Sequence, residues 1–212
     1  ILGAHVIPLE IPIGSEENFK GVIDLMDLKA YIYEEDSQGK DFRIEDIPQE
    51  YQEPAKQYRH MLVERAVSFD EALMKKYMES EDSLTVEELT RAIRQATISN
   101  KAVPVLCGAA FKNKGVQKLL DAVTLYLPSP LDLPAVKGHD PNDPAKVIER
   151  RPDANEPFCG LAFKVQADPH MGKLVYVRVY SGFLDTGSYV LNAGNNKKER
   201  VGRIVQMHAN LK

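Results

Sequence analysis

The sequence predicts a mixed α+β and α/β chain of several domains, whose last part is an incomplete antiparallel β-barrel. Apolar alternation dominates residues 6–33, helical periodicity dominates residues 51–127, and strand-like segments return after a proline-rich stretch. The 212 residues are 43% hydrophobic and 27% charged, as in an ordinary soluble protein with one large or two small cores. No run of about 18 apolar residues occurs, so no membrane-spanning helix is expected.

Strands are expected first. Residues 6–13 alternate as one strand with prolines of the edge type, and residues 19–25 and 29–33 are short β-branched and aromatic runs. From Tyr51 to Tyr77 apolar residues recur every three or four positions, which predicts a long amphipathic helix or a bent pair. A capping box at residues 85–88 begins the next helix.

A buried strand over residues 102–107, a loop over 108–114 and a helix over 115–127 form an α/β half-unit. Such a unit needs a parallel sheet, and we expect its other strands to lie outside this sequence. Seven of the 13 prolines fall between Pro128 and Pro157, which is typical of a stiff linker. Antiparallel strands are then expected at residues 158–167, 173–181, 188–192 and 199–207.

Cysteine and histidine usage indicates no metal centre and no disulfide scaffold. Cys107 and Cys159 stand about fifty residues apart in apolar stretches, so both are expected to be reduced, buried and inert, as suits the cytoplasm. The five histidines show no i,i+4 pair.

Charge is distributed unevenly. From Met171 onward there are seven Lys and Arg against two acids, a net +5 within a total of −4, so the rest carries −9. The basic end is a candidate for contact with a phosphate backbone, although solubilised barrel exteriors are often basic too.

Three short motifs suggest enzymes. Asp185-Thr186-Gly187 resembles the aspartic protease signature, but one copy would require a homodimer, and a polar hairpin turn is the simpler interpretation. Asn113-Lys114-Gly115 lacks the aspartate that would complete a guanine-reading motif, and its glycine is expected to begin the following helix. No Gly-x-x-x-x-Gly-Lys-[Ser/Thr] loop is present, so nothing in the sequence would hold the β- and γ-phosphates.

Several longer motifs, read in order, resemble bacterial-type translation elongation factor G. Residues 107–117 resemble its fifth GTPase motif, and residues 127–132 resemble the end of its GTPase domain. Residues 19–100 are similar to the insertion within that domain. Its second domain is resembled by Glu156-Pro157-Phe158, Ala162-Phe163-Lys164, Ala167-Asp168-Pro169, Arg178-Val179-Tyr180-Ser181-Gly182 and Gln206-Met207-His208-Ala209-Asn210.

The resemblance implies an internal fragment, cut from a longer chain before Ile1, of a ribosome-dependent GTPase that promotes tRNA and mRNA translocation. It implies an insertion subdomain with flanking strand at 1–101, a remnant of a P-loop GTPase sheet at 102–130, a linker at 131–156 and part of the domain II translation-factor barrel at 157–212. GTP and magnesium would belong to the parent protein, with no cofactor and no catalytic residue in this fragment.

Site residues follow from the same resemblance. Ala109, Ala110 and Phe111 would form a vestigial guanine-side loop, with Ala109 where the family has serine. Glu64 and Glu71 would contact the stalk protein of the large ribosomal subunit, on a helix side shared with Ser68, and the barrel would contact rRNA.

Two other hypotheses stay open from the sequence: a stand-alone adaptor with an acidic helical module and a basic β module, and the dimeric aspartic protease at Asp185-Thr186-Gly187. Unpaired edges at residues 103–107 and in the unclosed barrel also predict self-association or local disorder.

Overall fold

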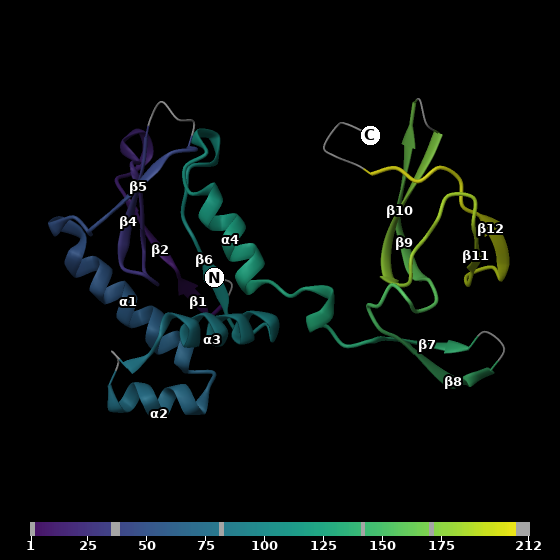
Figure 1. Cartoon of the computed structure of the whole chain (residues 1–212), viewed down its shortest axis with the longest axis horizontal. Helices are drawn as coiled ribbons and strands as arrows, with labels where there is room; N and C mark the ends of the chain where they lie inside the picture. Colours follow the sequence, from purple (N-terminus) through teal and green to yellow (C-terminus); the bar gives the residue numbers. More distant parts are fainter. Residues whose placement is uncertain (1–2, 35–38, 81–82, 141–142, 170–171, 207–212) are drawn as a thin grey trace. The chain divides into compact units, whose positions relative to one another are not determined.

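The computed structural model describes residues 3–34, 39–80, 83–140, 143–169 and 172–206 (Figure 1). It forms two compact units, Ile1–Pro128 and Ser129–Lys212. The first unit combines helices with a parallel strand pair and an antiparallel sheet, whereas the second consists of two-stranded antiparallel sheets. The predicted mixed fold is confirmed, and the described residues contain no closed barrel.

A four-stranded antiparallel sheet is the centre of the first unit. Its strands β2 (Glu10–Ile13), β3 (Gly21–Asp24), β4 (Lys29–Tyr33) and β5 (Phe42–Glu45) follow one another in space as in sequence. Both faces of the sheet are covered, because adjacent residues of β3 enter different clusters. Ile23 packs into the main core, whereas Val22 packs with Phe19 and Tyr33.

Residues 6–13, predicted as one strand, form two. β1 (Val6–Pro8) pairs in parallel with β6 (Val103–Val105), and β2 then joins the antiparallel sheet. Leu9 connects them: its N–H donates to the Val105 carbonyl at 2.8 Å, and its carbonyl accepts from Leu25 N–H at 2.9 Å. One continuous segment therefore belongs to two sheets.

The β1–β6 pair corrects an expectation, since β6 was predicted to have no parallel neighbour in this sequence. Val6 is opposite Val103 and Pro8 is opposite Val105. The signal was missed because a three-residue strand is too short to show periodicity and is recognised only by the partner that it finds. Self-association through β edges stays a prediction.

Four helices complete the first unit: α1 (Gln52–Val67), α2 (Glu71–Glu79), α3 (Val86–Ile98) and α4 (Val116–Tyr126). The bent-pair alternative is confirmed, because the chain leaves helical geometry at Asp70 between α1 and α2. The predicted capping box of α3 forms, and Gly115 with φ of 84° begins α4. The buried apolar residues of these helices include Leu62, Val63, Ala66, Val67, Leu73, Leu89, Ile93, Ala122 and Tyr126.

The second unit begins with a hairpin inside the segment expected to be a linker. β7 (Val136–Asp140) pairs with β8 (Asp143–Arg150). Its side chains are exposed or half-buried, so main-chain pairing rather than a core defines it. Prolines are tolerated there because an edge strand does not use every N–H group.

Two further antiparallel pairs follow, β9 (Cys159–Asp168) with β10 (Gly172–Ser181) and β11 (Tyr189–Asn192) with β12 (Lys197–Arg200). The strand expected at residues 199–207 is shorter and earlier, and Met207 lies outside the described residues. Among the described residues, every buried hydrophobic side chain belongs to the first unit. No described helix is long and apolar enough to span a membrane.

Candidate functional site

The loop Gly108–Lys114 follows β6 and is closed at its base. Ala109 N–H donates to the Lys114 carbonyl at 2.8 Å, and Lys114 N–H returns to the Ala109 carbonyl at 3.2 Å. Between them Ala110–Lys112 make one turn of 3₁₀ helix, and Asn113 has φ of 54°. The loop is therefore a compact structure with a defined tip.

The three residues expected on the guanine side lie on this loop, with increasing exposure toward its tip. Ala109 is half-buried, Ala110 is exposed and the Phe111 side chain is fully exposed. The structure thus brings the three residues together on one accessible turn. Nothing in the geometry tests their role toward a nucleotide.

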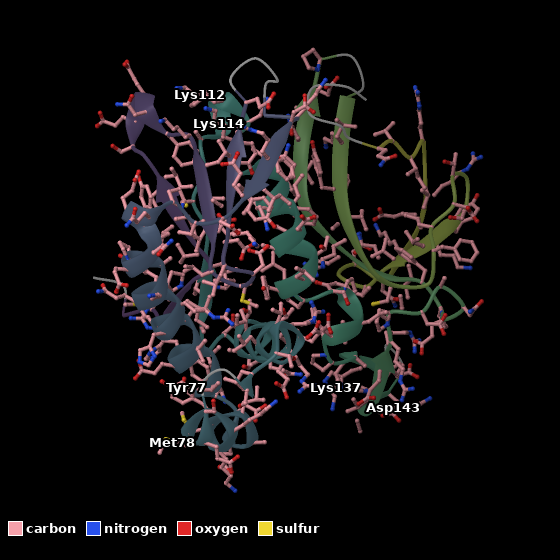
Figure 2. The ribbon with its side chains drawn as sticks, turned by 60° about the vertical axis from the view of Figure 1, so that its left-hand side comes forward. Tyr77, Met78, Lys112, Lys114, Lys137 and Asp143 are labelled. Carbon is pink, nitrogen blue, oxygen red and sulfur yellow. The ribbon has the colours of Figure 1, made fainter. Side chains whose placement is uncertain are left out.

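Lys114 was not identified from the sequence as a site residue. Its side chain is only 5% exposed, and its ammonium group donates to the Phe19 carbonyl at 3.1 Å. Lys112, two residues earlier, is exposed, and Figure 2 labels both lysines at the same end of the unit. Lys114 connects the loop to the segment between β2 and β3.

Glu10 is the second residue that sequence reasoning missed. It lies on β2 with 6% exposure, and one carboxylate oxygen accepts the Cys107 N–H at 3.2 Å while the other has no protein partner. Burial raises the pKa of Glu10 to about 7, Asp24 raises it further, and the Cys107 N–H and Lys118 oppose the increase. An acidic residue within the apolar alternation of residues 6–13 was the available signal.

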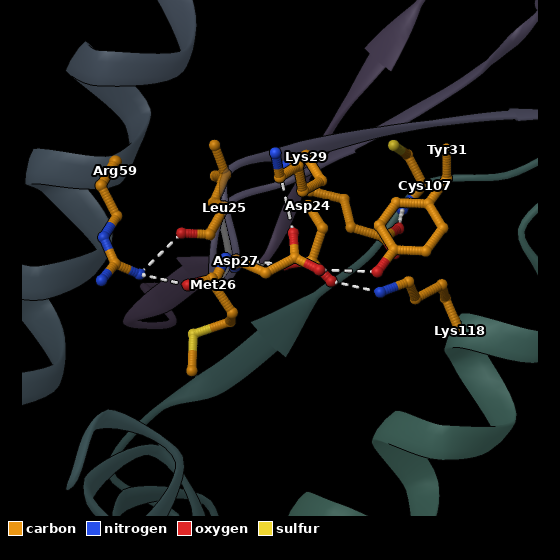
Figure 3. A network of polar contacts seen from close by, with 10 residues as sticks. Asp24, Leu25, Met26, Asp27, Lys29, Tyr31, Arg59, Cys107 and Lys118 are labelled. Atoms are coloured by element: carbon orange, nitrogen blue, oxygen red, sulfur yellow. Dashed lines mark hydrogen bonds and ion pairs between the residues drawn. The ribbon is translucent and has the colours of Figure 1, made fainter. Parts of the chain in front are cut away.

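The turn between β3 and β4 is a polar centre approached from two helices (Figure 3). From α1, Arg59 donates to the carbonyls of Leu25 at 2.7 Å and Met26 at 3.3 Å. From α4, the Lys118 ammonium contacts Asp24 at 2.5 Å. The turn therefore fixes the antiparallel sheet between α1 and α4.

Tyr31 and Asp27 complete this network. The Tyr31 hydroxyl donates to Asp27 at 2.6 Å, and the Lys118 ammonium lies 3.6 Å from the centroid of the Tyr31 ring. Burial by itself lowers the pKa of Lys118, but the bonds to Asp24 and Tyr31 outweigh it, so the pKa is raised. Lys118 is therefore a cation held for structure rather than a proton donor.

Glu64 and Glu71 do not share a helix, which corrects their predicted placement on one side with Ser68. Glu64 is exposed on α1, Ser68 caps its carboxyl end, and Glu71 is the first residue of α2. Asp70 separates the helices by capping α2, accepting from Ala72 N–H at 2.9 Å and Leu73 N–H at 3.1 Å. An aspartate before Glu-Ala-Leu was a helix-start signal that the apolar spacing concealed.

Asp185 lies in a turn, as the simpler interpretation of the protease-like motif predicted. Its carbonyl accepts the Ser188 N–H at 3.2 Å and the Ser188 hydroxyl at 2.6 Å, and Gly187 has φ of 84°. The described residues also contain no group of three His, Cys, Asp or Glu side chains able to hold a metal ion.

Comparison with known proteins gives two findings. Residues 157–212 match the family described as Elongation factor G domain 2. A crystal structure of an elongation factor G-like protein from Thermus thermophilus is similar, with a TM-score of 0.68 and 27% identity over 92% of this chain. The chain spans 26% of the length of that protein. The resemblance to elongation factor G inferred from the motifs is confirmed, whereas the bacterial type stays a prediction.

Proposed function

We propose that this chain is the part of an elongation factor G that carries the guanine-side loop, the GTPase-domain insertion and the start of domain II. The observation that carries the proposal is the domain 2 match at residues 157–212, preceded by a strand, loop and helix at residues 103–126. The stand-alone adaptor does not account for this order. The parent protein would be a ribosome-dependent GTPase of the cytoplasm that promotes translocation in protein synthesis.

The chain by itself would not hydrolyse GTP. The loop Ala109–Phe111 offers an exposed main chain, and the Ala110 N–H could face the guanine carbonyl oxygen without help from a side chain. The sequence has no glycine-rich phosphate loop, so phosphates and magnesium would be held elsewhere in the parent protein. The residues present thus fit the edge of a guanine base and nothing more of the nucleotide.

Two surfaces would contact the ribosome. The exposed acidic residues Glu64 and Glu71 would bind the stalk protein of the large subunit, through side chains on neighbouring helices. The basic second unit would contact rRNA, with Lys164 and Arg178 on its paired strands β9 and β10. Both contacts are electrostatic, so both should weaken as salt increases.

Cosedimentation of the chain with ribosomes tests the proposal. At low salt we expect saturable binding that weakens when the stalk proteins are stripped from the ribosome. A fluorescent GDP analogue is expected to bind with affinity weaker than micromolar, and GTP is expected to persist. No binding of the folded chain to intact ribosomes, or hydrolysis of GTP by the chain alone, would contradict the proposal.

A further inference from the structure

The segment from Cys107 to Gln117 is fastened to the antiparallel sheet and the adjoining chain at several points. Before the loop, Cys107 N–H donates to Glu10 of β2. At its end, Lys114 donates to the Phe19 carbonyl, and on α4 the Gln117 amide donates to the Gly39 carbonyl. These contacts link residues 78 to 97 positions apart in the sequence.

Lys114 has a distinct place among these contacts because it belongs to the loop itself. Its main chain closes the loop on Ala109, and its side chain reaches Phe19, which is 8% exposed. A buried ammonium group that loses water must regain hydrogen bonds from the protein, so its bond to the Phe19 carbonyl resists displacement.

We propose that Lys114 is a positioning residue that fastens the loop Gly108–Lys114 to the insertion sheet, so that the sheet determines how the tip is presented. The exposed tip at Ala110–Lys112 has little packing of its own, and its conformation depends on the base. Movement of the chain at Phe19 would thereby reach the loop. The inference rests on the proposed function only in taking the tip as the guanine side.

Amide hydrogen exchange measured by NMR on the full chain tests the role of Lys114. The variant Lys114→Met keeps the aliphatic length and removes the ammonium group, and Lys112→Met is the matched control at an exposed lysine of the same loop. The reporting amides are those of Lys112 and Asn113, which donate to the carbonyls of Ala109 and Ala110 at 2.9 and 3.0 Å.

In Lys114→Met we expect these two amides to exchange at least about tenfold faster, because the loop opens locally without its fastening. Amides of α1 should keep their rates, and Lys112→Met should resemble the unaltered chain. Unchanged loop rates in Lys114→Met would overturn the proposal.

Loss of global stability is distinguished by repeating the measurement in low urea. Local release exposes little surface, so the faster exchange should depend weakly on urea, whereas global unfolding depends steeply on it. A steep dependence shared with the α1 amides would also overturn the proposal, by making Lys114 a general stabiliser. None of these readouts requires a nucleotide or a ribosome, so failure of the proposed function would leave them unaffected.

Discussion

The ammonium group of Lys118 on α4 lies 2.5 Å from the carboxylate of Asp24 at the end of β3. The two side chains are only 20% and 13% exposed, and the same ammonium group lies over the Tyr31 ring. This pair joins the α4 helix of the parallel strand–loop–helix unit to the antiparallel sheet. It is the contact through which the two substructures of the first unit share a core.

Replacing Lys118 by methionine is expected to destabilise the chain by roughly 2 kcal/mol. Breaking a fully buried pair costs about 3–5 kcal/mol, and this pair keeps some solvent. Urea unfolding of the first unit measures the loss. Lys29→Met is the matched control: Lys29 pairs with Asp46 at 2.8 Å, but the side chains are 46% and 93% exposed, so a loss below about 1 kcal/mol is expected. Equal losses would show that burial does not decide the outcome.

Glu10 is expected to make stability depend on pH. Its folded pKa of about 7 lies above the ordinary value of 4.5, so the folded state binds the proton more tightly. The contribution is fully present below pH 4.5 and is lost as the pH rises toward 7, by roughly 3 kcal/mol in all.

Urea unfolding between pH 5 and 8 tests this for Glu10→Gln, which should remove most of that slope, with the exposed Glu17→Gln leaving it intact. A slope that persists unchanged in Glu10→Gln would rule out Glu10 as its source.

Cys107 is expected to react slowly with thiol reagents. Burial, aided by the nearby charge of Glu10, raises the pKa of its thiol to about 12, and the thiolate is the reactive form. In a Cys159→Ser background, labelling at pH 8 should be slower in the folded chain than in urea by a factor on the order of 10²–10³. Similar rates in both states would mean that Cys107 is accessible and ordinary in its titration.

Glu64 and Glu71 are expected to act as separate contacts because they lie on different helices. Since an exposed charge pair contributes roughly 0.2–1 kcal/mol, reversing either charge should weaken binding of the stalk protein's carboxyl-terminal domain by about two- to fivefold. Titration at low salt of Glu64→Lys and Glu71→Lys measures each contribution. Glu53→Lys is the control, an exposed acid at the other end of α1. Unchanged affinity with unchanged helicity would remove these residues from the interface.

Elements that depend on neighbours along the chain could be predicted from the residues alone. The capping box at Thr85 and the helix start at Gly115 formed where predicted, because a cap satisfies N–H groups of its own first turn. The family resemblance was available for the same reason, since its motifs are continuous runs of residues.

Contacts between distant segments became visible only in the folded chain. The parallel pairing of β1 with β6, the burial of Glu10 and Lys114, and the Asp24–Lys118 pair join residues about 90 or more positions apart. A local pattern holds no information on which buried polar group meets which partner, because desolvation and pairing are set by packing. For that reason the loop Ala109–Phe111 was found from the sequence, whereas the residues that hold it in place were found only in the fold.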